Sequence, residues 1–182
     1  MRELSMHILD LAQNSIAAGA SLVLMEVEAD TNADKLSICI SDNGTGMSEE
    51  LLSSVKDPFT TTRTTRRVGL GIPMIAEAAK ACEGDVIVDS EVGRGTVVAS
   101  WFKLSHIDRA PLGDVASTIV ALVAPNPDVD FVYTQRVDGT EFTLDTRDIK
   151  NQLDGVPINE PAVLSWLRNY VAEKTTCLVR ID

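Results

Sequence analysis

Asp10 and Asn14 form the first polar pair in the chain that has an obvious chemical use. They are four residues apart in a segment with helical periodicity, so the carboxylate and the carboxamide stack one turn apart on one helix face. An Asn oxygen can ligate Mg²⁺, and a neighbouring Asp can orient a water molecule as a general base. An exposed polar helix face is the alternative interpretation.

A second polar segment follows the apolar run that begins at Ile38. It reads Asp42-Asn43-Gly44-Thr45-Gly46-Met47. A carboxylate at a strand end can accept a hydrogen bond from an exocyclic amine, and glycines let the backbone approach a flat ring without side-chain interference. A plain Asn-Gly turn is the alternative.

Two further segments carry glycine with cationic or hydroxyl side chains. Residues 57–67 are rich in Thr and Arg and continue into Val68-Gly69-Leu70-Gly71 at a predicted helix start. Hydroxyls, guanidiniums and free backbone N–H groups at a helix N-terminus are what a triphosphate requires. Gly93-Arg94-Gly95-Thr96 leads into a strand. The alternative interpretation of residues 57–71 is a surface loop beside a glycine cap. The alternative for residues 93–96 is an ordinary hairpin turn.

The flanking sequence predicts the elements that position these segments. Leu4, Ile8, Leu11 and Ser15 share one stripe of a helix that ends at Gly19. The same reasoning predicts helices at 4–18, after Ser48, 71–82, 115–123 and 161–173, and strands at 21–29, 35–41, 86–90, 96–104, 129–137 and 140–144. This order predicts an α+β fold with helices on one face of a sheet. Residues 105–111 break the pattern and divide the chain into 1–105 and an accessory α+β region, 106–182.

Composition narrows the class of protein. The 182 residues include 27 acidic and 16 basic side chains, giving a net charge of −11, which argues against nucleic acid as the main partner. Three cysteines without a C-x-x-C pair and only two histidines argue against a disulfide framework and a transition-metal centre, and fit a reducing cytoplasm. The longest apolar run, residues 119–124, is too short to cross a membrane.

Taken together, the four segments resemble the four sequence boxes of the GHKL ATPase superfamily, in the family's order and within residues 1–105. The superfamily comprises gyrase-type topoisomerase subunits, heat-shock chaperones, histidine kinases and mismatch-repair ATPases. The resemblance implies a Bergerat-type two-layer α/β sandwich, in which a mixed sheet carries helices on one face. Residues 106–182 would add a small C-terminal α+β extension.

The resemblance also implies ATP and Mg²⁺ as cofactors and a role for each matching residue. Asn14 would bind the Mg²⁺ that bridges the phosphates, and Asp42 would hydrogen-bond the adenine amine. Thr96 would support the adenine end of the site through Asp42. The other cofactor-binding positions are Ala18, Gly44, Gly46 and Met47, and in the ATP lid Phe59, Thr62, Arg63, Gly69, Leu70 and Gly71. Gly69, Leu70 and Gly71 would present backbone N–H groups to the phosphates.

Two positions depart from the family pattern. ATP-hydrolysing members place Glu at the catalytic position where this chain has Asp10, one methylene shorter, and histidine kinases usually have Gly where Arg67 stands. Because those kinases carry a dimerisation helix with a phosphoacceptor His before the core, which here starts at residue 1, we expect no autonomous histidine-kinase signalling. The first box is closest to the mismatch-repair version, whereas the lid is closest to the kinase version.

Two functions therefore stay open for a Mg-dependent ATP-binding protein. It acts as a slow ATPase or as a kinase component toward a protein partner, or it is a non-hydrolysing ATP-sensing interaction module. A DNA-processing ATPase is disfavoured because no basic C-terminal domain follows. More weakly, 131–168 resembles the tails of small stand-alone ATP-binding proteins encoded near iron-only hydrogenase genes, which suggests a phosphoacceptor or a redox, hydrogenase-linked protein as partner.

Overall fold

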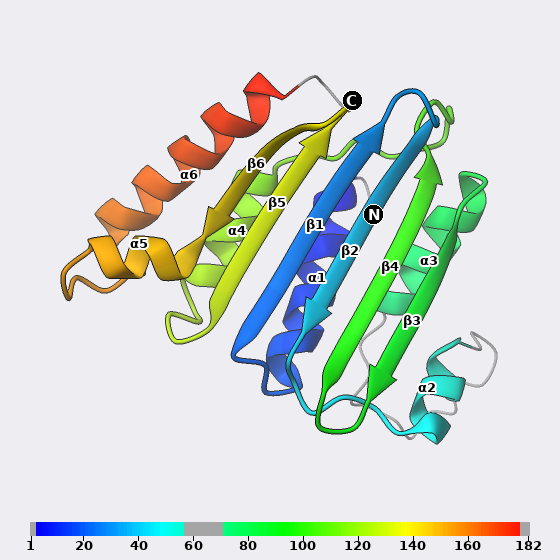
Figure 1. Ribbon diagram of the computed structural model, residues 1–182, viewed down its shortest axis with the longest axis horizontal. Coiled ribbons are helices and arrows are strands. Elements are labelled where there is room, and N and C mark those ends of the chain that lie inside the picture. Colours follow the sequence, from blue (N-terminus) through cyan, green and yellow to red (C-terminus); the bar gives the residue numbers. More distant parts are fainter. Residues whose placement is uncertain (1–2, 57–70, 179–182) are drawn as a thin grey trace.

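The structure is a computed structural model that describes residues 3–56 and 71–178. Its elements run, in chain order, α1 (Leu4–Ala17), β1 (Leu22–Asp30), β2 (Lys35–Asp42), α2 (Glu49–Lys56), α3 (Gly71–Ala81), β3 (Asp85–Glu91), β4 (Gly95–Lys103), α4 (Val115–Val123), β5 (Asp130–Val137), β6 (Thr140–Asp145), α5 (Thr146–Gln152) and α6 (Pro161–Cys177). The six strands form one sheet in the order β3-β4-β2-β1-β5-β6 (Figure 1). Only the β1–β5 pair is parallel within that described sheet.

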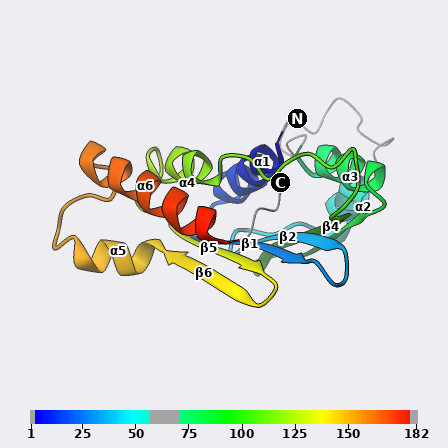
Figure 2. The same ribbon diagram turned by 90° about the horizontal axis from the view of Figure 1, so that it is seen from above.

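The molecule has two layers. Helices α1, α3, α4 and α6 lie along one face of the sheet, as the view from above shows (Figure 2). The mixed sheet with helices on one face confirms the α+β, two-layer sandwich that the sequence predicts.

Strand alternation and the helical stripe together build the core between the layers. Val23, Met25 and Val27 of β1 are almost fully buried on the helix-facing side. Leu4 and Ile8 of α1 are 1% exposed and meet this side of the sheet. Apolar side chains recur every second residue on the strand and about every 3.6 residues on the helix, and both sets are buried in the same layer. Burial of the apolar stripe fixes the orientation of α1 about its axis, so its polar face points away from the core.

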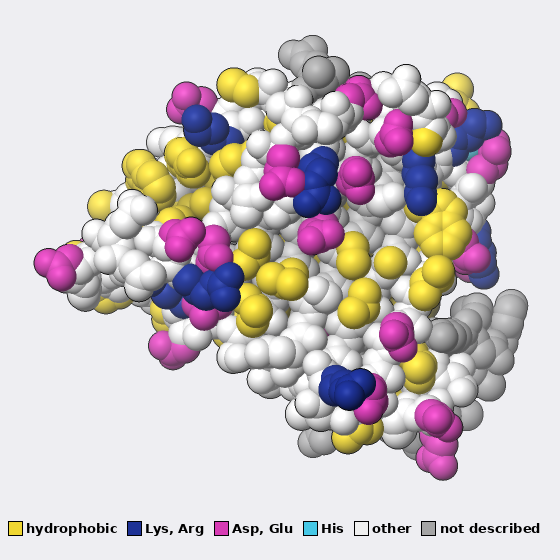
Figure 3. All heavy atoms as spheres, viewed as in Figure 1, with side chains coloured by type: hydrophobic (Ala, Val, Ile, Leu, Met, Phe, Trp, Pro, Cys, Tyr) yellow, Lys and Arg dark blue, Asp and Glu magenta, His cyan; other side chains and the backbone are white. Residues whose placement is uncertain are grey.

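The opposite face of the sheet is open and carries mixed side chains (Figure 3). Ile87 is 56% exposed and Val97 39% exposed on this side, and Arg136 forms an ion pair with Glu141 across β5 and β6. In the part of the chain that the structure describes, no helix combines the length and apolar character needed to span a membrane.

The C-terminal region continues the same sheet. Strand β5 pairs with β1 in parallel from Leu22 opposite Asp130 to Ala29 opposite Val137. Helix α4 packs against both α1 and α6. Residues after 105 therefore extend the sheet and the helical layer in line with the first four strands (Figure 1).

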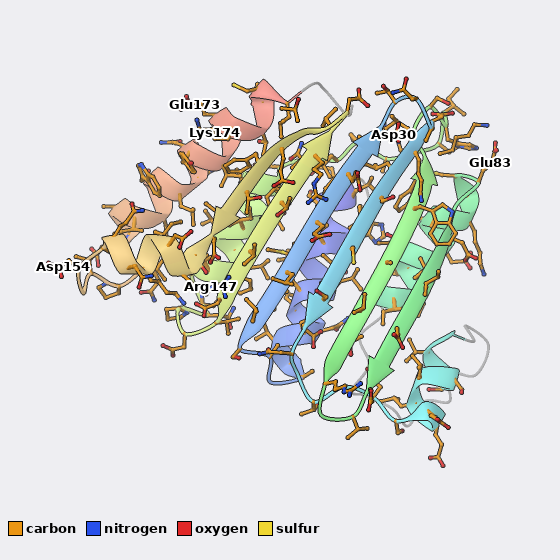
Figure 4. All side chains as sticks on the ribbon, in the orientation of Figure 1. Asp30, Glu83, Arg147, Asp154, Glu173 and Lys174 are labelled. Carbon is orange, nitrogen blue, oxygen red and sulfur yellow. The ribbon has the colours of Figure 1, made fainter. Side chains whose placement is uncertain are left out.

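Helix α5 is the one described element that the sequence reasoning missed. It begins after Asp145, whose carboxylate accepts the backbone N–H of Arg147 at 2.9 Å and pairs with the Arg147 guanidinium (Figure 4). Thr146 is fully buried and its Oγ1 accepts the Phe131 N–H at 2.8 Å. Seven residues without an apolar stripe give no periodicity signal, so only the cap could have indicated this helix.

A buried hydrogen bond in β5 provides a test of this arrangement. Tyr133 is fully buried and its hydroxyl donates to Gln135 Oε1 at 2.7 Å. Tyr133→Phe leaves that buried amide oxygen without its donor, so we expect it to lower the free energy of unfolding by about 1–3 kcal/mol. Urea denaturation followed by circular dichroism measures the change.

The matched control is Tyr170→Phe in α6, where the side chain is only half-buried. We expect that change to stay within about 0.5 kcal/mol of the wild type, as for most surface substitutions. Equal unfolding free energies for Tyr133→Phe and the wild type would contradict the buried Tyr133–Gln135 hydrogen bond.

Candidate functional site

The carboxylate of Asp42 is held from two sides where β2 ends. The Ser15 hydroxyl of α1 donates to Asp42 Oδ2 at 2.6 Å, and the Gly44 N–H donates to Asp42 Oδ1 at 2.9 Å. Each carboxylate oxygen can accept more than one hydrogen bond, so both retain acceptor capacity. Asp42 is thus a fixed acceptor at the boundary between the sheet and α1.

The turn after Asp42 is fastened to the end of α1 and the start of β1. Asn43 Oδ1 accepts the N–H groups of Ser21 and Leu22, both at 2.9 Å. The Thr45 N–H donates to the Ala18 carbonyl at 2.9 Å. These bonds bring the second polar segment of the sequence against the last residues of the first.

Gly44 sits where a side chain would obstruct this approach. A Cβ added at Gly44 would lie 2.9 Å from the Ala18 carbonyl oxygen and 3.1 Å from the Ala18 Cβ. Ala18 and Gly44 therefore pack closely beside the Asp42 carboxylate, and this packing accounts for the glycine at position 44.

The fourth segment supports the second from the other side. Gly46 has φ +66°, and a Cβ there would come 2.0 Å from the Glu91 carbonyl oxygen. The Met47 N–H donates to Ser90 Oγ at 2.9 Å, and Ser90 Oγ donates to the Gly95 carbonyl at 2.9 Å. The glycine at 46 is thus required by both its backbone conformation and the closeness of β3.

Thr96 reaches Asp42 through the sheet. The two residues are register partners across β2 and β4. Thr96 Oγ1 forms its hydrogen bond with Ser90 Oγ at 2.8 Å, and because Ser90 already donates to Gly95, Thr96 is the donor. Thr96 therefore supports the backbone around Asp42, while Ser15 and Gly44 hold the carboxylate itself.

The other end of the site lies on the same helix. Asp10 and Asn14 are one turn apart on α1, and both are half-buried. Gly71, the first residue of α3, packs against them: a Cβ there would lie 3.2 Å from Asn14 Nδ2 and 3.3 Å from the Asp10 Cβ. The first segment therefore meets Gly71, the last residue of the third segment, at the N-terminus of α3.

The Asn14 amide suits a phosphate-bound Mg²⁺. Its Nδ2 is buried and has no hydrogen-bond partner among the described residues. A buried amide nitrogen without an acceptor is costly, and a ligand oxygen would satisfy it. Amide and carboxylate oxygens are the protein ligands Mg²⁺ prefers, and Mg²⁺ completes its shell with phosphate oxygens and water. Asn14, with Asp10 one turn away, fits this ion.

Five predicted lid positions lie outside the described residues: Phe59, Thr62, Arg63, Gly69 and Leu70. The remaining predicted residues form two groups, and Ser15, which was not predicted as a site residue, connects them. Asp42, Gly44 and Ala18 form one group, and Asp10, Asn14 and Gly71 form the other. Gly46, Met47 and Thr96 support the first group from the β3–β4 hairpin.

Sequence reasoning missed the side chains that hold the site together. Ser15 was placed on the apolar stripe of α1, yet its hydroxyl makes the shortest contact to Asp42. Ser90 links Met47 to the β3–β4 hairpin. A serine on an otherwise apolar, buried helix stripe is the signal that could have pointed to Ser15, because a buried hydroxyl requires a partner.

Comparison with known proteins identifies relatives over part of their length. The chain is 35% identical over 108 residues to the sensor protein kinase FleS of Pseudomonas aeruginosa, covering 59% of this chain and 26% of that one. It is 27% identical over 95 residues to sporulation kinase C of Bacillus subtilis, covering 52% of this chain and 22% of that one. The chain therefore matches only about a quarter of the length of these relatives.

A solved structure shares the fold. The N-terminal domain of a DNA repair protein superposes with a TM-score of 0.52 at 13% identity, over 80% of this chain and 53% of the other. At this identity the likeness concerns the fold alone. Residues 2–106 match the family described as histidine kinase-, DNA gyrase B-, and HSP90-like ATPase. That match, over more than half of the chain, confirms that the chain belongs to the GHKL ATPase superfamily and contains its ATP-binding domain.

Proposed function

We propose that this protein binds ATP with Mg²⁺ and acts as a slow ATPase or as a kinase component toward a protein partner. One observation carries the proposal. Within two turns, α1 supplies a hydroxyl that fixes Asp42 and the Asp10–Asn14 pair that packs on Gly71. Helix α1 therefore carries the phosphate-type pair itself and also fixes, through Ser15, the adenine-type acceptor Asp42 at the end of β2.

At the base end, Asp42 accepts the exocyclic amine of adenine. Ser15 and Gly44 hold the carboxylate in place for that contact. Gly44 packs directly on Ala18 beside this carboxylate, and Gly46 and Met47 are proposed to complete the adenine site on the hairpin side. Thr96 supports the strand end through its pairing with Asp42.

At the phosphate end, Asn14 supplies the amide oxygen for Mg²⁺, and its buried nitrogen donates to a phosphate oxygen. Gly71 presents a backbone N–H at the start of α3, where helix geometry favours anions. Bound Mg²⁺ neutralises phosphate charge. The lid residues Phe59, Thr62, Arg63, Gly69 and Leu70 are proposed to complete this end.

Asp10 is the proposed catalytic residue. Its carboxylate lies one turn before Asn14, on the helix face that packs against Gly71, from which it orients an attacking water or acceptor hydroxyl. For phosphoryl transfer, positioning and charge stabilisation carry most of the rate, so a carboxylate one methylene shorter than Glu is tolerable. The same shortening favours the second candidate, an ATP-sensing interaction module without turnover.

A single-turnover experiment separates the two. With enzyme in excess over γ-labelled ATP and Mg²⁺, we expect slow release of phosphate or its transfer to protein. Asp10→Ala should reduce the rate by about 100-fold or more, the usual loss for a general base, while ATP affinity stays close to the wild-type value.

Asp89→Ala, at an exposed position on β3, is the matched control and should leave the rate unchanged. A wild-type protein that binds ATP but neither releases nor transfers phosphate would favour the sensing module. Turnover that persists unchanged in Asp10→Ala would remove Asp10 from the catalytic role.

We further propose that residues 1–105 form the ATP-binding unit and that residues 106–182 provide a surface for a protein partner in the cytoplasm. Trp166 is 50% exposed on α6 and stacks on Tyr170 at 5.0 Å between ring centroids. Lys174, labelled on α6 in Figure 4, lies 5.7 Å from the Tyr170 ring. Exposed aromatic side chains such as Trp166 are enriched at protein interfaces. A phosphoacceptor or a redox, hydrogenase-linked protein is the proposed partner.

A further inference from the structure

A pocket lies on the helical side of the sheet. It has a volume of about 480 Å³ and opens between the first half of α1, the outer face of α3 and the segment after β4. Asn14, Asp42 and Gly71 are not among its lining residues. His7 lies one turn before Asp10 on α1, and Asp10 is likewise absent from the described lining residues. The described lining of the pocket therefore includes none of the residues assigned to ATP.

The lining is mostly apolar. Leu4 of α1, Pro73, Met74 and Ala78 of α3, and Phe102 of β4 contribute side chains. The volume falls within the range of about 300–1,000 Å³ typical of small-molecule sites, which combine apolar walls with a few polar groups. The pocket thus has both the size and the lining of a ligand site.

His7 supplies the polar group. It lines the pocket and is 2% exposed, and its Nδ1 has no hydrogen-bond partner among the described residues. Burial lowers the pKa of His7, so the imidazole is neutral at neutral pH. A buried ring nitrogen without a partner costs about 1–3 kcal/mol, and a polar atom of a bound molecule would recover that cost.

Charge restricts what can enter. Glu77 and Asp108 are exposed and both line the pocket, whereas no Lys or Arg is among the described lining residues. The nearby guanidinium of Arg109 donates to the carbonyls of Leu104 and Ala110. Two carboxylates at the mouth repel an anion and attract a cation.

From these observations we infer that the pocket binds a small molecule with an apolar body, one hydrogen-bonding atom for His7 Nδ1 and no negative charge. Such a molecule contacts α1 and α3, the two helices that also carry Asn14 and Gly71. The inference stands on the pocket alone and does not depend on ATP binding.

The test uses probes that differ only in the polar group: para-ethylphenol, para-ethylbenzylamine, para-ethylbenzoate and ethylbenzene. The methyl groups of methionine are labelled with ¹³C, because Met74 lines the pocket whereas Met47 lies beside Ser90. We expect the phenol and the amine to shift the Met74 resonance with a Kd of about 1 mM, as for ligands of this size. The benzoate should bind at least 10-fold more weakly, and Met47 should not respond.

Two variants locate the binding. Ala81 is exposed at the end of α3 and lines the pocket, so Ala81→Trp should weaken phenol binding at least 10-fold. Ala121→Trp, at an exposed position on α4, should change it less than 2-fold. His7→Leu keeps the apolar volume and removes the nitrogen, so it should weaken the phenol about 5-fold and leave ethylbenzene unchanged.

The outcomes are decisive in both directions. Three results together support the ligand pocket. The Met74 shift saturates, it is lost in Ala81→Trp, and the phenol and the amine bind more tightly than the benzoate. The inference is overturned by an unresponsive Met74, by equal shifts at Met74 and Met47, or by benzoate binding as tightly as the phenol. If His7→Leu weakens the binding of phenol and of ethylbenzene equally, the hydrogen bond to His7 is removed from the proposal.

Discussion

Asp42→Asn is expected to weaken ATP binding by about 10- to 150-fold, the range for losing a hydrogen bond to a charged group. The carboxylate is already held by the Ser15 hydroxyl and the Gly44 N–H. An Asn side chain at this place can still accept the Gly44 N–H with its single oxygen, but its NH₂ group replaces the oxygen that faces Ser15 and offers the adenine amine a donor in place of an acceptor. Isothermal titration calorimetry with Mg²⁺ and a non-hydrolysable ATP analogue measures the change.

Three comparisons make the result specific. Asp89→Asn removes a carboxylate from an exposed position on β3 and should leave affinity unchanged. Ser15→Ala loses one of the two groups that hold Asp42 and should weaken binding about 5-fold, less than the loss of the carboxylate. GTP, which presents a carbonyl where ATP presents an amine, should bind more weakly than ATP to the wild type, and this preference should shrink in Asp42→Asn.

ATP affinity that is the same in the wild type and Asp42→Asn would remove Asp42 from the adenine contact. Lower affinity accompanied by a lower unfolding free energy would instead indicate that Asp42 acts through the packing of Ser15 and the turn. Thermal unfolding of both proteins without nucleotide separates these two explanations.

Much of the fold follows from local patterns in the sequence. Leu4, Ile8 and Leu11 recur at helical spacing, and all three are buried in α1 as predicted. Asp138-Gly139 joins β5 to β6, as the Asp-Gly hairpin signal indicates. These features are determined by residues close together in the sequence, so they can be predicted from local sequence patterns.

The remaining features depend on partners distant in the chain. The parallel pairing of β5 with β1 joins residues more than a hundred positions apart, from Leu22 opposite Asp130 onward. Ser15 and Asp42 are 27 residues apart, and neither periodicity nor turn chemistry connects them. The cationic segment with Arg63, Arg66 and Arg67 lies outside the described residues, so its role at the phosphate end stays a prediction.

The second large effect is expected for Asn14→Ala, which should weaken binding of ATP with Mg²⁺ by about 100-fold. Asn14 is proposed to supply both an oxygen to Mg²⁺ and a buried nitrogen to phosphate, and that nitrogen has no partner among the described residues. The variant removes both contacts beside Gly71. Calorimetry in the presence of Mg²⁺, and again with EDTA, measures the two affinities.

The ratio of these affinities distinguishes a metal ligand from a packing residue. In the wild type, Mg²⁺ should strengthen ATP binding, whereas in Asn14→Ala the affinities with and without Mg²⁺ should become nearly equal. Asn32→Ala, at an exposed position between β1 and β2, should keep the wild-type ratio. If Asn14→Ala retains the full Mg²⁺ dependence, another group holds the metal, and Asp10, one turn away on α1, becomes the next residue to test.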